Sequence, residues 1–137
     1  MVSSYNTSTQ NLAIDETFTF TTNRVRTGCA VSHTPGAAEF VLHRPGYYYV
    51  AFNGTGATAG VAGDVTVTLL SDGTAVPGAE ASGYSGAAAE SVGLSFSTII
   101  KVLPSCGCVD NATTLTVQNT GVASTFETSN LVITKLG

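Results

Sequence analysis

The chain has 137 residues, 10% of them charged, and a formal net charge of −4. This length suits one domain with a sizeable core, and the lack of a basic run argues against nucleic-acid binding. No stretch of about 18 apolar residues occurs, so we expect no membrane-spanning helix. The start, "MVSSYNTSTQ", has no basic segment followed by an apolar one, so we expect no Sec-type signal peptide and production in the cytoplasm of a host cell.

Residues 1–15 are polar, rich in Ser, Thr and Asn, and follow no clear period. They predict an N-terminal arm that becomes ordered only by docking on a partner. Residues 16–137 then form the folded domain.

Short strands separated by turn signals fill the first half of that domain. "TFTFTTN" places Phe18 and Phe20 on one face, and "AEFVLHRPG" is a strand that ends at the turn dipeptide Pro45-Gly46. "GYYYVAFN" follows as a further strand. "GTGATAGVAG" predicts a flexible glycine-rich loop.

The second half continues the same pattern. "DVTVTLLSDG" alternates and ends at Asp72-Gly73, a hairpin signal, and Pro77 makes the returning "TAVPGAEAS" an edge strand. "SVGLSFSTIIKVL" is the longest candidate, and "TTLTVQNTG" and "SNLVITKLG" complete the set. The nearest helical candidate is "AAAESVGLSF", which Gly93 and the following β-branched run disfavour.

Two of these strands, at 46–54 and 92–103, are apolar on both faces. Tyr48, Val50 and Phe52 share one face of the first, while Tyr47 and Tyr49 share the other. A strand with one wet face should alternate apolar and polar residues, and no helix is predicted that could cover the second face. We therefore expect a second copy of the chain to cover it, with an interface that contains Tyr47, Tyr49, Ile99 and Leu103.

Regularly spaced short strands predict an all-β, antiparallel sandwich. The spacing Phe40-x5-Gly46-x-Tyr48-x-Val50-x-Phe52 resembles the signature of the complement/tumour-necrosis-factor-like jelly roll. Val50 stands where that signature has Phe, His33 stands at its preceding aromatic position, and its closing Phe-x-Gly-Phe pattern is absent. The resemblance implies a jelly roll that forms a homotrimer, with Phe40, Gly46, Tyr48, Val50 and Phe52 as its core signature.

The stretch "DVTVTLLSDGTAVPGAEAS" is similar to the bacterial and phage branch of that family, which includes the heads of spore-surface collagen-like glycoproteins. The chain carries no collagen-like or coiled-coil stalk. The resemblance therefore implies a structural protein of a phage virion surface, either a capsid decoration protein or a head fibre. In that reading residues 1–15 dock on the major capsid protein. The alternative is a trimeric head of a spore or cell surface that binds glycans or a receptor through the loops 54–63, 83–90 and 104–112, with Tyr84 as the aromatic contact.

Catalytic motifs are missing from the sequence. The two histidines, His33 and His43, lie in no metalloprotease or nucleophile-elbow motif, and no paired carboxylate motif of the glycosidase type is evident. We therefore expect no enzymatic activity and no cofactor.

Cys29, Cys106 and Cys108 are an odd set, which argues against a disulfide framework and favours reduced, mostly buried thiols. The alternative is a metal site formed by Cys106 and Cys108 with Cys29 or His33, although the C-x-C spacing is not that of a zinc knuckle. Three aspartates fall at predicted strand ends: Asp64, Asp72 and Asp110. We expect their side chains to cap turns, and the alternative is that they bind a cation in the loops.

Overall fold

The computed structural model of the chain describes residues 1–86, 90–104 and 112–136. These residues form eleven strands and no helix. The strands are β1 (Val2–Asn6), β2 (Gln10–Leu12), β3 (Thr22–Arg26), β4 (Val31–Ser32), β5 (Phe40–Leu42), β6 (Gly46–Thr58), β7 (Gly63–Ser71), β8 (Thr74–Ser85), β9 (Val92–Val102), β10 (Thr113–Asn119) and β11 (Ser124–Leu136).

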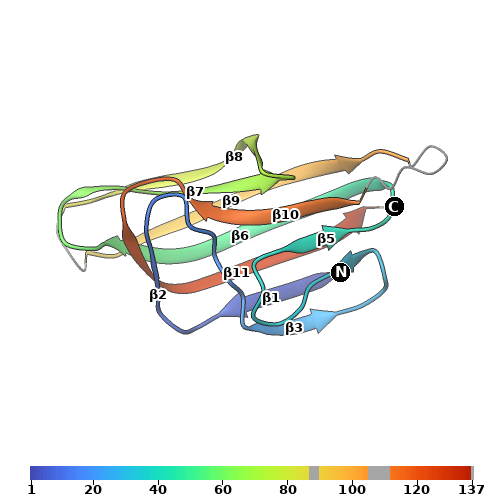
Figure 1. Ribbon diagram of the computed structural model, residues 1–137, viewed down its shortest axis with the longest axis horizontal. Helices are drawn as coiled ribbons and strands as arrows, with labels where there is room; N and C mark the ends of the chain where they lie inside the picture. The colour runs from blue at the N-terminus through green and yellow to red at the C-terminus, as the bar shows by residue number, and fades with distance from the viewer. Residues whose placement is uncertain (87–89, 105–111, 137) are drawn as a thin grey trace.

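The strands make two antiparallel sheets (Figure 1). The first sheet has the order β3-β1-β11-β6-β9, and β2 also pairs with β11. The second has the order β4-β5-β10-β7-β8. Side chains of both sheets meet in one core, so the predicted all-β, antiparallel sandwich of the jelly-roll kind is confirmed.

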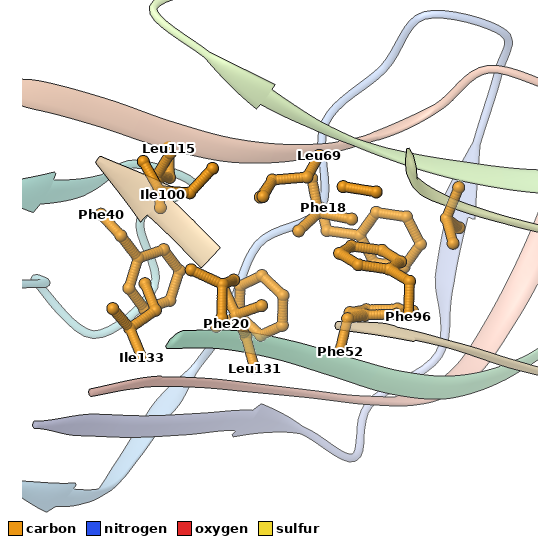
Figure 2. Close-up of a cluster of buried hydrophobic side chains, with 14 of the residues drawn as sticks. Phe18, Phe20, Phe40, Phe52, Leu69, Phe96, Ile100, Leu115, Leu131 and Ile133 are labelled. Atoms are coloured by element: carbon orange, nitrogen blue, oxygen red, sulfur yellow. The ribbon is translucent and has the colours of Figure 1, made fainter. Parts of the chain in front are cut away.

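Aromatic rings fill much of this core. In Figure 2, Leu69 and Leu115 of the second sheet point toward Phe52, Leu131 and Ile133 of the first. All five are at most 2% exposed. The ring centroids of Phe18 and Phe126 lie 4.5 Å apart, and those of Phe52 and Phe96 lie 5.3 Å apart.

The predicted core faces of the two long strands are the observed ones. Tyr48 and Val50 are fully buried, and the Tyr48 hydroxyl donates a hydrogen bond to the Arg44 carbonyl oxygen at 2.7 Å. Phe40 is also fully buried. On β9 the buried apolar residues lie on one face of the strand: Leu94, Phe96, Ile100 and Val102.

The prediction of an N-terminal arm is wrong. β1 lies inside the first sheet, between β3 and β11, and Val2 opposes Ile133 across the strand pair. Its polar residues are buried because hydrogen bonds satisfy them: Ser4 donates to Asn23 Oδ1, and Asn6 Nδ2 donates to the Thr19 carbonyl oxygen at 3.1 Å. The segment is therefore part of the fold.

The predicted glycine-rich loop is also wrong over its first half. β6 continues to Thr58, and Gly54 and Gly56 lie opposite Ser129 and Phe126 of β11. A Cβ atom on Gly54 would lie 2.7 Å from the Thr128 carbonyl oxygen, and one on Gly56 would lie 2.7 Å from the Phe126 ring. The two glycines thus permit a close approach of neighbouring strands.

Other local predictions divide in the same way. Asp72 and Gly73 form the turn between β7 and β8, both with positive φ (50° and 83°), as a two-residue hairpin of the primed kind requires. β8 is an edge strand, as expected. Phe18 and Phe20 are fully buried but lie in the connection before β3 and not in a strand. Backbone hydrogen bonds hold this connection in place, from the Phe18 amide to the Val117 carbonyl oxygen (2.8 Å) and from the Phe20 amide to the Ala37 carbonyl oxygen (3.3 Å).

Part of the disfavoured helical candidate, residues 87–89, lies outside the described residues, and its second half belongs to β9. In the part of the chain that the structure describes, no helix is long and apolar enough to cross a membrane.

Candidate functional site: the outer face of the first sheet

The outer face of the first sheet is the side of β6, β9 and β11 that points away from the core. Alternation along β6 puts Tyr47 and Tyr49 on this face, where they are 50% and 39% exposed. Tyr47 opposes Leu136 of β11, and Tyr49 opposes Ile99 of β9. Strand pairing therefore gathers residues that are far apart in the sequence.

We call the apolar part of this face the apolar corner; it consists of Tyr47, Tyr49, Ile99, Leu103 and Leu136. These are five of the ten large apolar side chains that are exposed among the described residues. At about 200 Å² for a large side chain in full exposure, their exposed fractions amount to about 490 Å². The largest apolar patch of a typical monomer is about 300–600 Å² and is often functional, so the corner is a candidate contact surface.

The structure thus brings together the four residues predicted for a self-interface, and it adds Leu136 through the pairing of β11 with β6. Lys101 is the one charged neighbour across from Tyr47, and its ammonium nitrogen lies 5.8 Å from the Tyr47 ring centroid. Whether a second copy covers this corner stays a prediction.

The other end of the same face is polar. Tyr5, Asn130, Asn53 and Ser95 lie side by side in one row across β1, β11, β6 and β9. Tyr5, Asn53 and Asn130 also line a shallow depression together with Arg24, whose guanidinium carbon lies 4.7 Å from the Tyr5 ring centroid.

Two polar atoms beside this depression are buried and have no hydrogen-bond partner, Ser129 Oγ and Asn130 Oδ1. A buried acceptor without a donor is costly. The row of polar residues was not predicted, because it depends on the pairing of β1 with β11, and β1 was assigned to an arm.

His33 belongs to the core of the sandwich. It is 3% exposed, and its ring stacks on Phe40 with centroids 4.0 Å apart. Its Nε2 donates to the Ala37 carbonyl oxygen at 2.9 Å, and its Nδ1 lies 2.6 Å from Asn23 Oδ1. The imidazole therefore packs in the core as an aromatic ring.

Burial lowers the pKa of His33 from its ordinary value of 6.5 and is the largest influence on it. The hydrogen bond to Ala37 and the nearby carboxylate of Glu39 raise this pKa, while the charge of Arg26 lowers it. Burial therefore favours the neutral form of this imidazole.

His43 accepts or donates a hydrogen bond at the surface, where its Nε2 lies 2.7 Å from Ser32 Oγ. Within the described residues no hydrogen bond joins a carboxylate to this imidazole. The pair is thus a hydroxyl and an imidazole without the third group that orients the base in a catalytic triad.

The predicted thiol and carboxylate sites are only partly covered by the structure. Cys29 is exposed and free, which is contrary to the expected burial, and Cys106, Cys108 and Asp110 lie outside the described residues. Asp72 lies in the β7–β8 turn and joins this turn to β10 by accepting a hydrogen bond from the Thr114 amide at 2.9 Å. No group of three or more His, Cys, Asp or Glu side chains that could hold a metal occurs in residues 1–86, 90–104 and 112–136.

Tyr84, the predicted loop aromatic, lies instead near the end of β8 and is 66% exposed. Of the predicted binding loops, 54–63 is half strand, and 83–90 and 104–112 fall partly outside the described residues.

Comparisons with known proteins give a fold and no family. No family model and no curated protein matches the chain. Among solved structures the chain is similar to the vertex protein P5 of phage PRD1, with a TM-score of 0.53 and 14% identity over 99% of this chain and 96% of that one. It also aligns with CBM35 from Cellvibrio japonicus Abf62, with a TM-score of 0.37 and 10% identity over 98% of each chain, a score too low to carry an argument. The likeness to the PRD1 protein supports the all-β sandwich of the jelly-roll kind.

Proposed function

We propose that this chain is a structural protein of a phage virion surface, in which three copies associate through the outer face of the first sheet. It acts as a capsid decoration protein or head fibre of the tumour-necrosis-factor-like kind. Its work is assembly and not chemistry.

The observation that carries the proposal is the apolar corner. Water contacts about 490 Å² of large apolar side chains there in the single chain. Covering that area contributes about 12 kcal/mol per subunit at about 25 cal/mol per Å², before the costs of association. Residues on one face of one sheet suit packing around a rotation axis, because each copy can present the same corner to that axis.

The virion setting rests on a second support. The PRD1 protein with a similar fold is a vertex protein, and the few charged residues of this chain suit a subunit that buries surface against its own copies. The first sheet incorporates residues 2–6 as β1, so we no longer assign contact with a shell to an N-terminal arm.

The test of assembly is the molar mass of the purified chain, measured by light scattering and by sedimentation over a range of concentrations. A trimer of three 13.9 kDa chains at micromolar concentration is expected, and a monomer at that concentration refutes the proposal. Virion association is tested separately, by immunogold labelling of purified particles with antibodies against the chain. Unlabelled particles contradict that part.

A second candidate function is glycan or receptor binding by the same trimer. Tyr84 favours it, because exposed aromatic rings stack on apolar ligand faces and this ring is 66% exposed. A glycan array probed with the wild type and with Tyr84→Ala separates the two roles. Hits that the substitution removes support binding, and an array without hits supports a purely structural role.

A further inference from the structure

We propose that the interface between subunits contains an ion pair, in which Arg24 of one subunit receives the carboxylate of Glu80 from the next. The inference rests on the proposed function, because it requires a closed ring of identical chains. It names the group that each subunit contributes to its neighbour.

Arg24 lies on β3, which is one edge of the first sheet. Its guanidinium covers the Tyr5 ring at 4.7 Å and lines the depression beside Asn53 and Asn130. Within the described residues no salt bridge or hydrogen bond engages this side chain. A guanidinium has five N–H donors arranged to fit a carboxylate, so the site offers donors that its own subunit leaves unused.

Glu80 lies on β8, the edge strand of the second sheet, and is exposed. Its one hydrogen bond comes from the Thr68 hydroxyl at 3.3 Å, and no cation pairs with it in the part of the chain that the structure describes. A free edge strand also presents backbone N–H groups.

The two side chains lie at the same level of the sandwich. A Cβ atom on Gly83 of β8 would lie 3.2 Å from Val92 Cβ of β9, so the strands meet there. Glu80 lies three residues before Gly83 on β8, and Ser95 lies three residues after Val92 on β9. Both steps lead in the same direction from the contact, so Glu80 and Ser95 lie at a similar height. Ser95 belongs to the row that ends at Tyr5, next to Arg24.

They also lie on opposite sides of the subunit. β3 is at one end of the first sheet and β9 is at the other, with β8 packed beside β9 (Figure 1). A head-to-tail ring brings one side of each subunit against the opposite side of the next. Rotation about an axis along the strands preserves height, so it brings Glu80 of one copy to the level of Arg24 on its neighbour.

The charges of the two sides are complementary. β3 carries Arg24 and Arg26, whereas the opposite side carries Glu80 on β8 and Glu90 before β9, with the cation Lys101 near the far end of β9. Charge complementarity across an interface fixes register and excludes other arrangements. The pair therefore sets which edges meet, while the apolar corner supplies most of the area.

The experiment is a charge swap in the full-length chain, read as the concentration at which half of the chains are trimeric, by sedimentation. Arg24→Glu and Glu80→Arg should each raise that concentration by about tenfold or more, because like charges oppose each other in the interface. The double variant should return to within about threefold of the wild type. Raised salt should reduce the difference between the single variants and the wild type.

Arg26→Glu combined with Glu80→Arg is the matched control, since Arg26 is an exposed arginine on the same strand. No rescue is expected from it. The neutral cycle of Arg24→Gln, Glu80→Gln and their double variant gives the same coupling if a charge reversal impairs folding.

Two outcomes overturn the inference in different ways. A trimeric wild type whose single effects simply add in the double variant overturns the ion pair and leaves the assembly intact. A monomeric wild type overturns the assembly and the pair together.

Discussion

Replacing Ile99 with Asp tests the apolar corner most directly. Ile99 is 57% exposed, and full burial of an isoleucine side chain contributes about 1.5–3 kcal/mol. Its exposed part therefore contributes about 1–2 kcal/mol per subunit when a neighbour covers it. A carboxylate at the same place adds the cost of removing an ion from water, which we take as about 2 kcal/mol per subunit at the low end.

Three subunits bring the loss to about 10 kcal/mol per trimer, which is about seven powers of ten in the dissociation constant. Because that constant contains the square of a concentration, the concentration for half-assembly rises on the order of a thousandfold. Sedimentation and light scattering of Ile99→Asp should therefore give a monomer at concentrations where the wild type is a trimer.

The matched control is Val61→Asp, which changes an even more exposed apolar residue (72%) in the turn between β6 and β7. It should leave the molar mass unchanged, and circular dichroism should show the same fold for both variants. An Ile99→Asp protein that stays trimeric, with a concentration for half-assembly near that of the wild type, would refute the reasoning about this corner.

Three further predictions concern the fold. Deleting residues 1–7 should abolish cooperative thermal unfolding, because β1 lies between β3 and β11. A normal unfolding transition would instead support the hypothesis that these residues form a separate N-terminal arm. Gly121→Ala should lower the free energy of unfolding by about 1–3 kcal/mol in urea, since its Cβ would collide with the Asp64 carbonyl oxygen, while Gly93→Ala, with open space around it, should have little effect. His33 should make stability pH-dependent: burial lowers its folded pKa below the ordinary value of 6.5, so its stabilising contribution is present above about pH 6.5 and is lost as the pH falls below it. The urea midpoint should drop between pH 7.5 and pH 5, and an equal drop in His33→Gln would contradict this.

Alternation was the part of the fold that sequence reasoning could predict. On β6 and β9 the large apolar residues recur mostly at intervals of two, and this period determines which residues share a face, whatever the neighbouring strands are. Tyr48 and Ile100 therefore lie in the core, and Tyr49 and Ile99 lie outside it, as predicted.

The rest depends on pairing between distant segments. "VSSYN" is too polar to predict a buried strand, and Ser4 and Asn6 are buried only because Asn23 and the Thr19 carbonyl oxygen meet their hydrogen bonds. Gly54 indicates a loop by composition, but the neighbouring β11 requires a residue without a side chain there.

The same reason explains what was missed in the candidate site. Tyr47 and Tyr49 indicate an apolar face from the local sequence alone. The depression at Arg24, in contrast, forms only where β3, β1 and β11 lie side by side. No short motif marks such a site. The stacking of His33 on Phe40 was missed for a related reason. A histidine in a sequence suggests a catalytic or metal-binding residue, whereas here the imidazole packs as a phenyl ring would.

The position of β11 has a consequence for biosynthesis. Of the described strands β11 comes last in the sequence, yet it pairs with β1 on one side and with β6 on the other. During synthesis the edge of β1 that faces β11 therefore stays unpaired until β11 has been made. Such long-range pairing slows folding and prolongs exposure to aggregation.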